Sequence, residues 1–303
     1  MTKNDITRGL IDFAVSQCLK NIKEDPYRSI RRLADLGRQF AKGRFQEELF
    51  SLFQRLLLNE DGPYYEMLKQ LVSSVDTDSL KTLGINIGYN SWTCGASRLR
   101  QITAEKDYPH WLAETSLSPE SSASQLKEQL SAALKNGTYA FRLHMPAQSI
   151  TTDTRQLGLI REFPDCSFFL DFMDTDCTYS DDLLELTCSC DNLAFLVPFG
   201  SLQSRQLVDL LNARQRIYGV CRTYDNTNAA ERISDSQISE MLSWGSPLLF
   251  FLAAADTTQD NRLLVDNAIL DARLHQTYPA LLIHLDADVA RIQQLLLSSR
   301  KNL

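Results

Sequence analysis

Ionisable residues recur where short apolar runs of this sequence end. Arg142 and His144 end one run, Asp171 ends the next, and His284 and Asp286 end the last. A carboxylate beside a histidine can transfer protons. Asp171, His144, His284 and Asp286 are therefore the candidate catalytic residues.

A second group of residues could bind a ligand without transforming it. Two arginines would hold a carboxylate or phosphate, and aromatic rings would stack on it. These ligand-binding candidates are Tyr89, Asn90, Trp92, Arg142, Arg222 and Tyr224. Strand ends are polar in all proteins built from alternating strands and helices, so any one of these residues alone has a purely structural explanation. Only the collection indicates a pocket.

Metal ligands and disulfides are not expected. The sequence has no HxH, HExxH or CxxC spacing, the patterns that mark common metal sites. Its seven cysteines are an odd number and lie scattered along the chain, which favours reduced thiols in a cytoplasm over a disulfide framework. Cys188 and Cys190 are interpreted as buried structural thiols.

The candidate residues are positioned by a pattern that repeats over residues 138–286. An apolar run ends in a polar residue, an amphipathic helix follows, and another apolar run begins. The runs cover 138–144, 167–171, 192–198, 217–222, 247–253 and 279–286. Strands that alternate with helices predict a parallel sheet, whose carboxyl ends share one edge where ligands bind.

A further strand is expected at Leu83–Asn90, which brings the number of strand–helix units to seven. About 48 residues separate it from the next strand, so either two helices or a missed strand must fill the gap. Within the gap, residues 105–124 are irregular. Their cluster of Tyr108, His110 and Trp111 is either a lid over a site or a connection pinned by aromatic rings.

These units predict an α/β fold, an incomplete (β/α) TIM-like barrel with an N-terminal all-helical subdomain. A flat, doubly wound sheet is the alternative. The barrel is favoured because the units are short, uniform and sequential and lack a glycine-rich dinucleotide turn. Apolar residues at helical spacing place four helices in residues 1–82, so the expected domains are 1–82 and 83–303.

Charge and hydropathy restrict the partners. The net charge of −7 argues against a global electrostatic hold on nucleic acid. We see no apolar run of the roughly 18–20 residues of a membrane span and no signal peptide, and we expect a cytoplasmic protein. Six basic residues between 28 and 44 form either a docking face for an acidic protein partner or an ordinary solvated helix surface. They are Arg28, Arg31, Arg32, Arg38, Lys42 and Arg44.

Three stretches carry a resemblance to a known family. Residues Arg8–Ala14, Asp35–Gln46 and Gly84–Trp92, followed by the barrel-like units, resemble a group of uncharacterised clostridial proteins loosely linked to radical S-adenosylmethionine enzymes. The resemblance implies an incomplete parallel barrel and S-adenosylmethionine as a candidate cofactor. Those enzymes bind an iron–sulfur cluster through CxxxCxxC after the first strand. The matching positions here are Asn90, Cys94 and Ser97, so one of three thiols is present and a relative without the cluster is expected.

We expect the chain to bind a small polar or anionic ligand at the carboxyl ends of the strands, in a non-catalytic or sensory role. Three alternatives stay open: an acid–base barrel enzyme, a radical-type enzyme, and an accessory protein that docks a partner through its helical subdomain.

Overall fold

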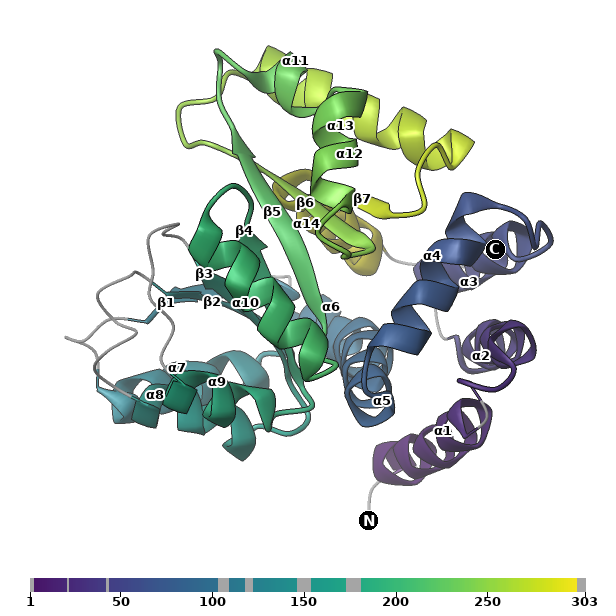
Figure 1. Ribbon diagram of the computed structural model, residues 1–303. Helices are drawn as coiled ribbons and strands as arrows, with labels where there is room; N and C mark the ends of the chain where they lie inside the picture. Colours follow the sequence, from purple (N-terminus) through teal and green to yellow (C-terminus); the bar gives the residue numbers. More distant parts are fainter. Residues whose placement is uncertain are drawn as a thin grey trace.

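The computed structural model describes residues 3–20, 22–41, 44–102, 109–117, 122–145, 154–172 and 181–298. The chain begins with helices that pack on one another before the sheet starts (Figure 1). They are α1 (Lys3–Leu19), α2 (Pro26–Phe40), α3 (Arg44–Leu56), α4 (Pro63–Ser74), α5 (Thr77–Ile85), the π-helix η1 (Asn86–Gly95) and α6 (Ala96–Ile102). The first four confirm the helices expected from the apolar spacing. The expected division into two domains at residue 82 stays a prediction, and the helices continue past this residue.

The strand expected at Leu83–Asn90 is wrong. Leu83, Ile85, Ile87 and Tyr89 alternate with other residues as in a strand, but this stretch is helical throughout. Asp76 starts the helix by accepting a hydrogen bond from the Ser79 backbone N–H at 3.0 Å, as an N-cap does.

Two asparagines, four residues apart, hold this helix against the sheet. Asn86 donates to the carbonyl oxygens of Pro164 and Cys166, each at 2.9 Å, and Asn90 donates to that of Asp165 at 2.9 Å. These bonds satisfy carbonyl groups just before a strand. Tertiary contacts therefore override the local alternation.

Seven parallel strands form one sheet in sequential order, and the sheet curls into an open half-barrel (Figure 1). The strands are β1 (Leu112–Ser116), β2 (Ala140–Met145), β3 (Ser167–Phe172), β4 (Leu193–Pro198), β5 (Tyr218–Tyr224), β6 (Leu248–Ala253) and β7 (Leu281–His284). The first is the strand missed in the irregular stretch. The others confirm the predicted runs, and the curled sheet excludes the flat alternative.

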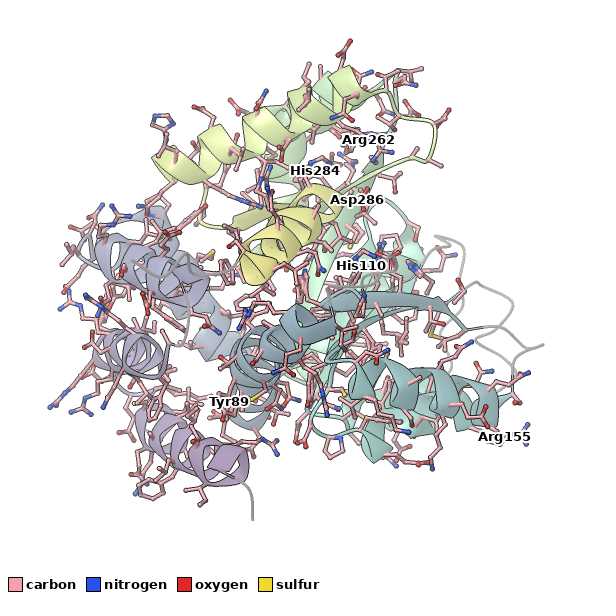
Figure 2. All side chains as sticks on the ribbon, turned by 180° about the vertical axis from the view of Figure 1, so that it is seen from behind. Tyr89, His110, Arg155, Arg262, His284 and Asp286 are labelled. Atoms are coloured by element: carbon pink, nitrogen blue, oxygen red, sulfur yellow. The ribbon has the colours of Figure 1, made fainter. Side chains whose placement is uncertain are left out.

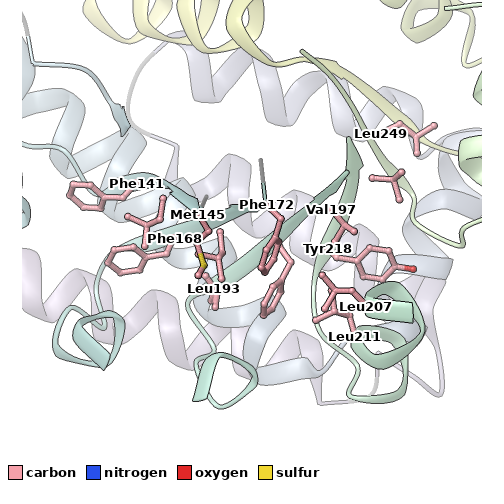
Figure 3. Close-up of a cluster of buried hydrophobic side chains, with 14 of the residues drawn as sticks. Phe141, Met145, Phe168, Phe172, Leu193, Val197, Leu207, Leu211, Tyr218 and Leu249 are labelled. Atoms are coloured by element: carbon pink, nitrogen blue, oxygen red, sulfur yellow. The ribbon is translucent and has the colours of Figure 1, made fainter. Parts of the chain in front are cut away.

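Helices between the strands cover the outer face of the sheet. They are α7 (Ala123–Lys135), α8 (Thr154–Gly158), the 3₁₀ turn η3 (Leu159–Glu162), α9 (Asp181–Cys188), α10 (Leu202–Ala213), α11 (Ala229–Arg232), α12 (Asp235–Leu242) and α13 (Gln259–His275). The main core lies between these helices and alternate strand residues such as Phe168, Leu170 and Phe172. Figure 3 shows part of it, with the rings of Phe168 and Phe172 directed into the same layer.

The inner face packs against other helices. Side chains of α5, α6 and the last helix, α14 (Leu285–Leu297), meet inner-face residues such as Ala140, Phe169 and Phe250. Helix α14 reaches from the end of β7 to Trp111, just before β1. There Gln293 accepts from the Trp111 backbone N–H at 2.9 Å, and the indole N–H donates to the Val289 carbonyl at 3.0 Å. Helix α14 thus bridges the open side of the half-barrel.

Candidate functional site

Four ionisable side chains gather on the inner face at the carboxyl ends of β1, β2 and β3. Glu114 lies in register beside Arg142, and His144 lies beside Asp171. Because side chains alternate along a strand, Arg142 and His144 point to the same face. The structure brings the candidates Arg142, His144 and Asp171 together. We call Glu114, Arg142, His144 and Asp171 the inner-face cluster.

Arg142 is the centre of this cluster. Its Nε and Nη2 donate to Asp171 Oδ2 at 3.0 and 2.6 Å, and its Nη1 donates to Glu114 Oε1 at 3.1 Å. The side chains of Arg142 and Asp171 are 8% and 7% exposed, whereas that of Glu114 is 48% exposed. A ligand therefore meets Glu114 first.

His144 lies between the two carboxylates. Its Nε2 is 3.3 Å from Glu114 Oε2, and its Nδ1 is 3.2 Å from Asp171 Oδ2. The second contact has the distance of an ion pair but not the direction of a good hydrogen bond. Asp171 first and Glu114 second raise the pKa of His144 to about 9. At neutral pH the imidazole is therefore charged, and the cluster holds two positive and two negative groups.

The pKa of Glu114 is shifted in the direction opposite to that of His144. The hydrogen bond from His144, together with Arg142, lowers the pKa of Glu114 to about 2. Its carboxylate is ionised across the physiological range. It is also the group that bridges both cations, because one oxygen faces Arg142 and the other faces His144.

The second predicted histidine lies on the opposite face. His284 ends β7 and points between the sheet and α13, where its Nε2 is 2.6 Å from the hydroxyl of Tyr224 and its Nδ1 is 3.4 Å from Asp266 Oδ1. His284 is 2% and Tyr224 1% exposed, and burial raises the pKa of Tyr224 to about 12. This tyrosine–histidine–aspartate chain is largely buried and links β5, β7 and α13.

Asp286 does not share a strand face with His284, because β7 ends at His284. Asp286 lies in the first turn of α14 and pairs with Arg262 at 3.3 Å. Figure 2 shows His284, Asp286 and Arg262 near one another and in a different part of the molecule from Tyr89. Of the four catalytic candidates, only His144 and Asp171 meet, whereas His284 lies on the outer face and Asp286 lies at the start of α14.

Arg222 also points to the outer face. Its guanidinium lies 4.4 Å from the ring centroid of Phe199 and hydrogen-bonds Gln237. It cannot share a rim with Arg142, which points inward from β2. The expected pair of arginines at one ligand site is not formed.

Tyr89, Asn90 and Trp92 lie at the other end of the sheet. They belong to the π-helix, which Asn90 attaches to the chain just before β3. Tyr89 packs on Ile11 and Ile85, and the rings of Trp92 and Trp111 meet edge to face with centroids 5.9 Å apart. Their expected place at the carboxyl edge was wrong because it required a strand at 83–90.

Glu114 is the cluster member that sequence reasoning missed. It lies on β1, whose sequence Leu112-Ala-Glu-Thr-Ser116 lacks an apolar run. A strand at the edge of a sheet, with one neighbour, needs less apolar surface than a central one. The available signal was the gap of about 48 residues, together with the alternation of Leu112, Glu114 and Ser116.

The positions that match the radical-enzyme motif do not fit an iron–sulfur cluster. Asn90 and Cys94 are in a helix at the amino ends of the strands, not in a loop at the carboxyl edge. The Asn90 amide is already bonded to Asn86 Oδ1 and the Asp165 carbonyl. A cluster also needs several thiolates. Over the described ranges, no three His, Cys, Asp or Glu side chains are grouped to hold a metal ion.

Two other expectations have mixed outcomes. Arg31 pairs with Glu60 at 2.5 Å and Arg38 donates to Gln54 at 2.7 Å, so part of the basic surface at 28–44 ties α2 to its neighbours. Lys42 lies outside the described residues, and docking there stays a prediction.

Trp111 is buried and bonded to α14, which favours a pinned connection, whereas Tyr108 lies outside the described residues.

No protein-family model and no curated protein matches this chain. None of its described helices combines the length and the apolar character needed to cross a bilayer.

Proposed function

We propose that this protein binds a small anionic ligand at the inner-face cluster, in a non-catalytic or sensory role. The supporting observation is the position of Glu114, whose two carboxylate oxygens rest 3.1 Å from Arg142 Nη1 and 3.3 Å from His144 Nε2. A ligand carboxylate has the same planar geometry and charge, and a phosphate also presents two anionic oxygens to such a pair of donors. Glu114 therefore occupies the place that such a ligand would take.

The exposure of the cluster members supports the replacement of the Glu114 carboxylate by a ligand anion. Glu114 is half exposed on an edge strand, so its side chain can swing into solvent. Asp171 stays behind Arg142 and fixes the guanidinium through two bonds to one oxygen. Asp171 is thus a positioning residue, and Arg142 and His144 are the ligand contacts.

Calorimetric titration with inorganic phosphate, glycerol 3-phosphate and citrate tests the proposal. Because Glu114 competes for the same two cations, we expect Glu114→Ala to bind one of these anions at least tenfold more tightly than the wild type. His144→Gln should bind it at least tenfold more weakly. The matched control is Glu162→Ala, since Glu162 is 49% exposed and pairs with Lys127 at 2.5 Å outside the cluster.

Two results would contradict the proposal. One is that none of the three anions binds either the wild type or Glu114→Ala. The other is that Glu162→Ala raises the affinity as much as Glu114→Ala, because the gain would then reflect net charge alone.

A second candidate is an acid–base enzyme, which the protonated state of His144 favours. With a pKa of about 9, this imidazole would act as a general acid and not as a base at neutral pH. Glu114→Gln should then lower the pKa of His144, which NMR of its ring protons measures. It should also move the alkaline limb of the pH–activity profile to lower pH. A limb that does not follow the measured pKa would exclude His144 as the acid.

A further inference from the structure

The helical region contains a cavity of about 290 Å³ between α1, α2, α3, α5 and η1. Its walls are mostly apolar and include Ile11, Val15, Leu36, Phe40 and Phe50. It is partly open to solvent, whereas enclosed voids larger than a water molecule are few in protein interiors. The cavity approaches the lower end of small-molecule sites, about 300 Å³, and is roughly twice the size of a cavity of about 150 Å³ that accepts benzene.

Two glycines keep the cavity open. Gly84 and Gly88 are four residues apart, so they lie on one helix face, and both line the cavity. A Cβ built on either would meet no heavy atom within 4 Å. Glycine is unfavourable inside a helix because it gains nothing from packing and loses much backbone freedom. Close packing does not require glycine at positions 84 and 88, because no neighbouring atom would clash with a Cβ there. The effect of the two glycines is to leave this face of the helix without side chains, and we call it the bare face.

The π-helix is the second unusual element of this wall. η1 lines the cavity with Gly88, Tyr89 and Thr93, and Figure 2 shows Tyr89 next to α1. π-helical turns are rare and occur frequently at functional sites. Inside the cavity Gln46 donates to the Thr93 hydroxyl at 2.6 Å, and Thr93 donates to the Gly88 carbonyl at 3.2 Å. These polar groups bond to one another, which leaves an apolar surface for a ligand.

The side chain of Lys81 carries a positive charge about one helical turn before Gly84. Lys81 lines the cavity, and its ammonium lies 3.7 Å from Asp12 and 3.8 Å from Asp78. Charge-assisted hydrogen bonds are about 2.7–2.9 Å long, so both pairs are loose. Both carboxylates are more than half exposed, whereas Lys81 is 24% exposed. A ligand carboxylate could approach the ammonium more closely than either aspartate does.

We propose that this cavity binds a medium-chain carboxylate, with the alkyl chain along Gly84 and Gly88 and the carboxylate at Lys81. At about 30 Å³ per heavy atom, the share of one water in the liquid, the cavity holds on the order of ten heavy atoms. Decanoate, with ten carbon atoms besides the two carboxylate oxygens directed to Lys81, is therefore the probe. This site is separate from the inner-face cluster, and the two proposals stand or fall independently.

Calorimetric titration of the full chain tests the cavity with decanoate, and with 1-decanol as the analogue without a charge. The wild type should bind decanoate in a saturable 1:1 manner and decanol more weakly. Gly88→Leu and Gly84→Leu place a side chain in the open space, so both should weaken both ligands at least tenfold without lowering Tm. Gly9→Leu is the matched control, because Gly9 is an exposed helical glycine with nothing within 4 Å of its Cβ position and does not line the cavity.

The charge is tested by Lys81→Met, which removes the ammonium and shortens the unbranched side chain by one heavy atom. It should weaken decanoate about tenfold and leave decanol unchanged. The proposal is overturned if decanoate does not saturate the wild type, or if both leucine variants bind as the wild type does. Equal losses of decanoate and decanol in Lys81→Met would overturn the role of the ammonium. His144→Gln should bind decanoate normally, which separates this result from that of the inner-face cluster.

Discussion

Arg142 and Asp171 place two opposite charges where each side chain is less than a tenth exposed. A buried charge without a partner is strongly unfavourable, so such a pair persists only when the geometry and the other hydrogen bonds are good. Here Arg142 also reaches Glu114, and His144 lies beside both carboxylates. The balanced charges of this cluster need not make the protein more stable, because apolar residues that filled the same space would give a similar free energy of unfolding. What the cluster provides is a specific arrangement of charged groups.

The pH dependence of stability should report this cluster. The pKa of His144 is raised from 6.5 to about 9 on folding, so its stabilisation is complete below about pH 6.5 and is lost as the pH rises through 9. The pKa of Glu114 is lowered from 4.5 to about 2, so its stabilisation is present above about pH 4.5 and is lost as the pH falls through 2. The two effects describe one shared interaction and are not added.

We therefore expect the difference in unfolding free energy between the wild type and His144→Gln to be largest from pH 4.5 to 6.5. It should shrink by about 2 kcal/mol by pH 10, since one pKa unit corresponds to about 1.4 kcal/mol and the full shift is an upper bound. Urea unfolding at pH 6 and pH 10 measures it. His275→Gln, at an exposed histidine, should show no such change. A difference independent of pH would contradict the raised pKa.

Sequence reasoning located three of the four cluster members, because strand periodicity and the shared carboxyl edge fix their positions. It could not place the two histidines on different faces. Which residue of a strand faces inward depends on register, and a shift of one residue reverses every side chain. Leu282 and His284 point outward whereas Arg142 and His144 point inward, and the apolar runs contain no sign of this difference.

At the scale of elements, a close contact between two glycines joins the helical region to the sheet. A Cβ on Gly95, the last residue of η1, would lie 2.3 Å from the Gly137 carbonyl oxygen, and one on Gly137 would lie 2.7 Å from that of Gly95. Gly137 also has φ of +99°, where side chains are strained. Gly95 therefore serves the close contact between η1 and the turn that precedes β2.

Gly95→Ala should therefore lower the unfolding free energy by about 2 kcal/mol, within the range typical of overpacking. The backbone oxygen cannot move aside as a side chain could. Gly9→Ala in α1 is the control and should be neutral or stabilising by up to about 1 kcal/mol, because its Cβ meets nothing within 4 Å. Chemical unfolding of both variants gives the comparison. A loss below 0.5 kcal/mol for Gly95→Ala, within the usual scatter of surface changes, would mean that the two segments separate easily.

The element that sequence reasoning assigned to the wrong class illustrates a limit of periodicity. Apolar residues at every second position predict a strand, and Leu83 to Tyr89 follow that rule. The deciding contacts come from Asn86 and Asn90, which bond to carbonyl groups 75 to 80 residues away. Such partners are invisible in a local window.

At the scale of the whole molecule, α14 completes a barrel that seven strands leave open. We expect Leu296→Ala to lower the unfolding free energy by about 3 kcal/mol, as for other buried leucines, because Leu296 is 3% exposed among Trp111, Leu99 and Ala140. Its neighbour Leu295 is 39% exposed, and Leu295→Ala should cost less than 1 kcal/mol. Urea unfolding followed by tryptophan fluorescence measures both. Equal effects would show that α14 is not integral to the inner core.

The same helix has a consequence for how the protein is made. The contacts of α14 with Trp111 and Arg100 join residues 182 and 196 positions apart. At about 5–20 residues per second, the interval between synthesis of Phe169 and of Leu296 is on the order of ten seconds. Throughout that interval the inner-face residues that pack on α14, such as Phe169, lack that helix, although α5 and α6 have already been made. A ribosome-associated chaperone would find its binding surface there, and would be displaced when α14 packs onto the sheet.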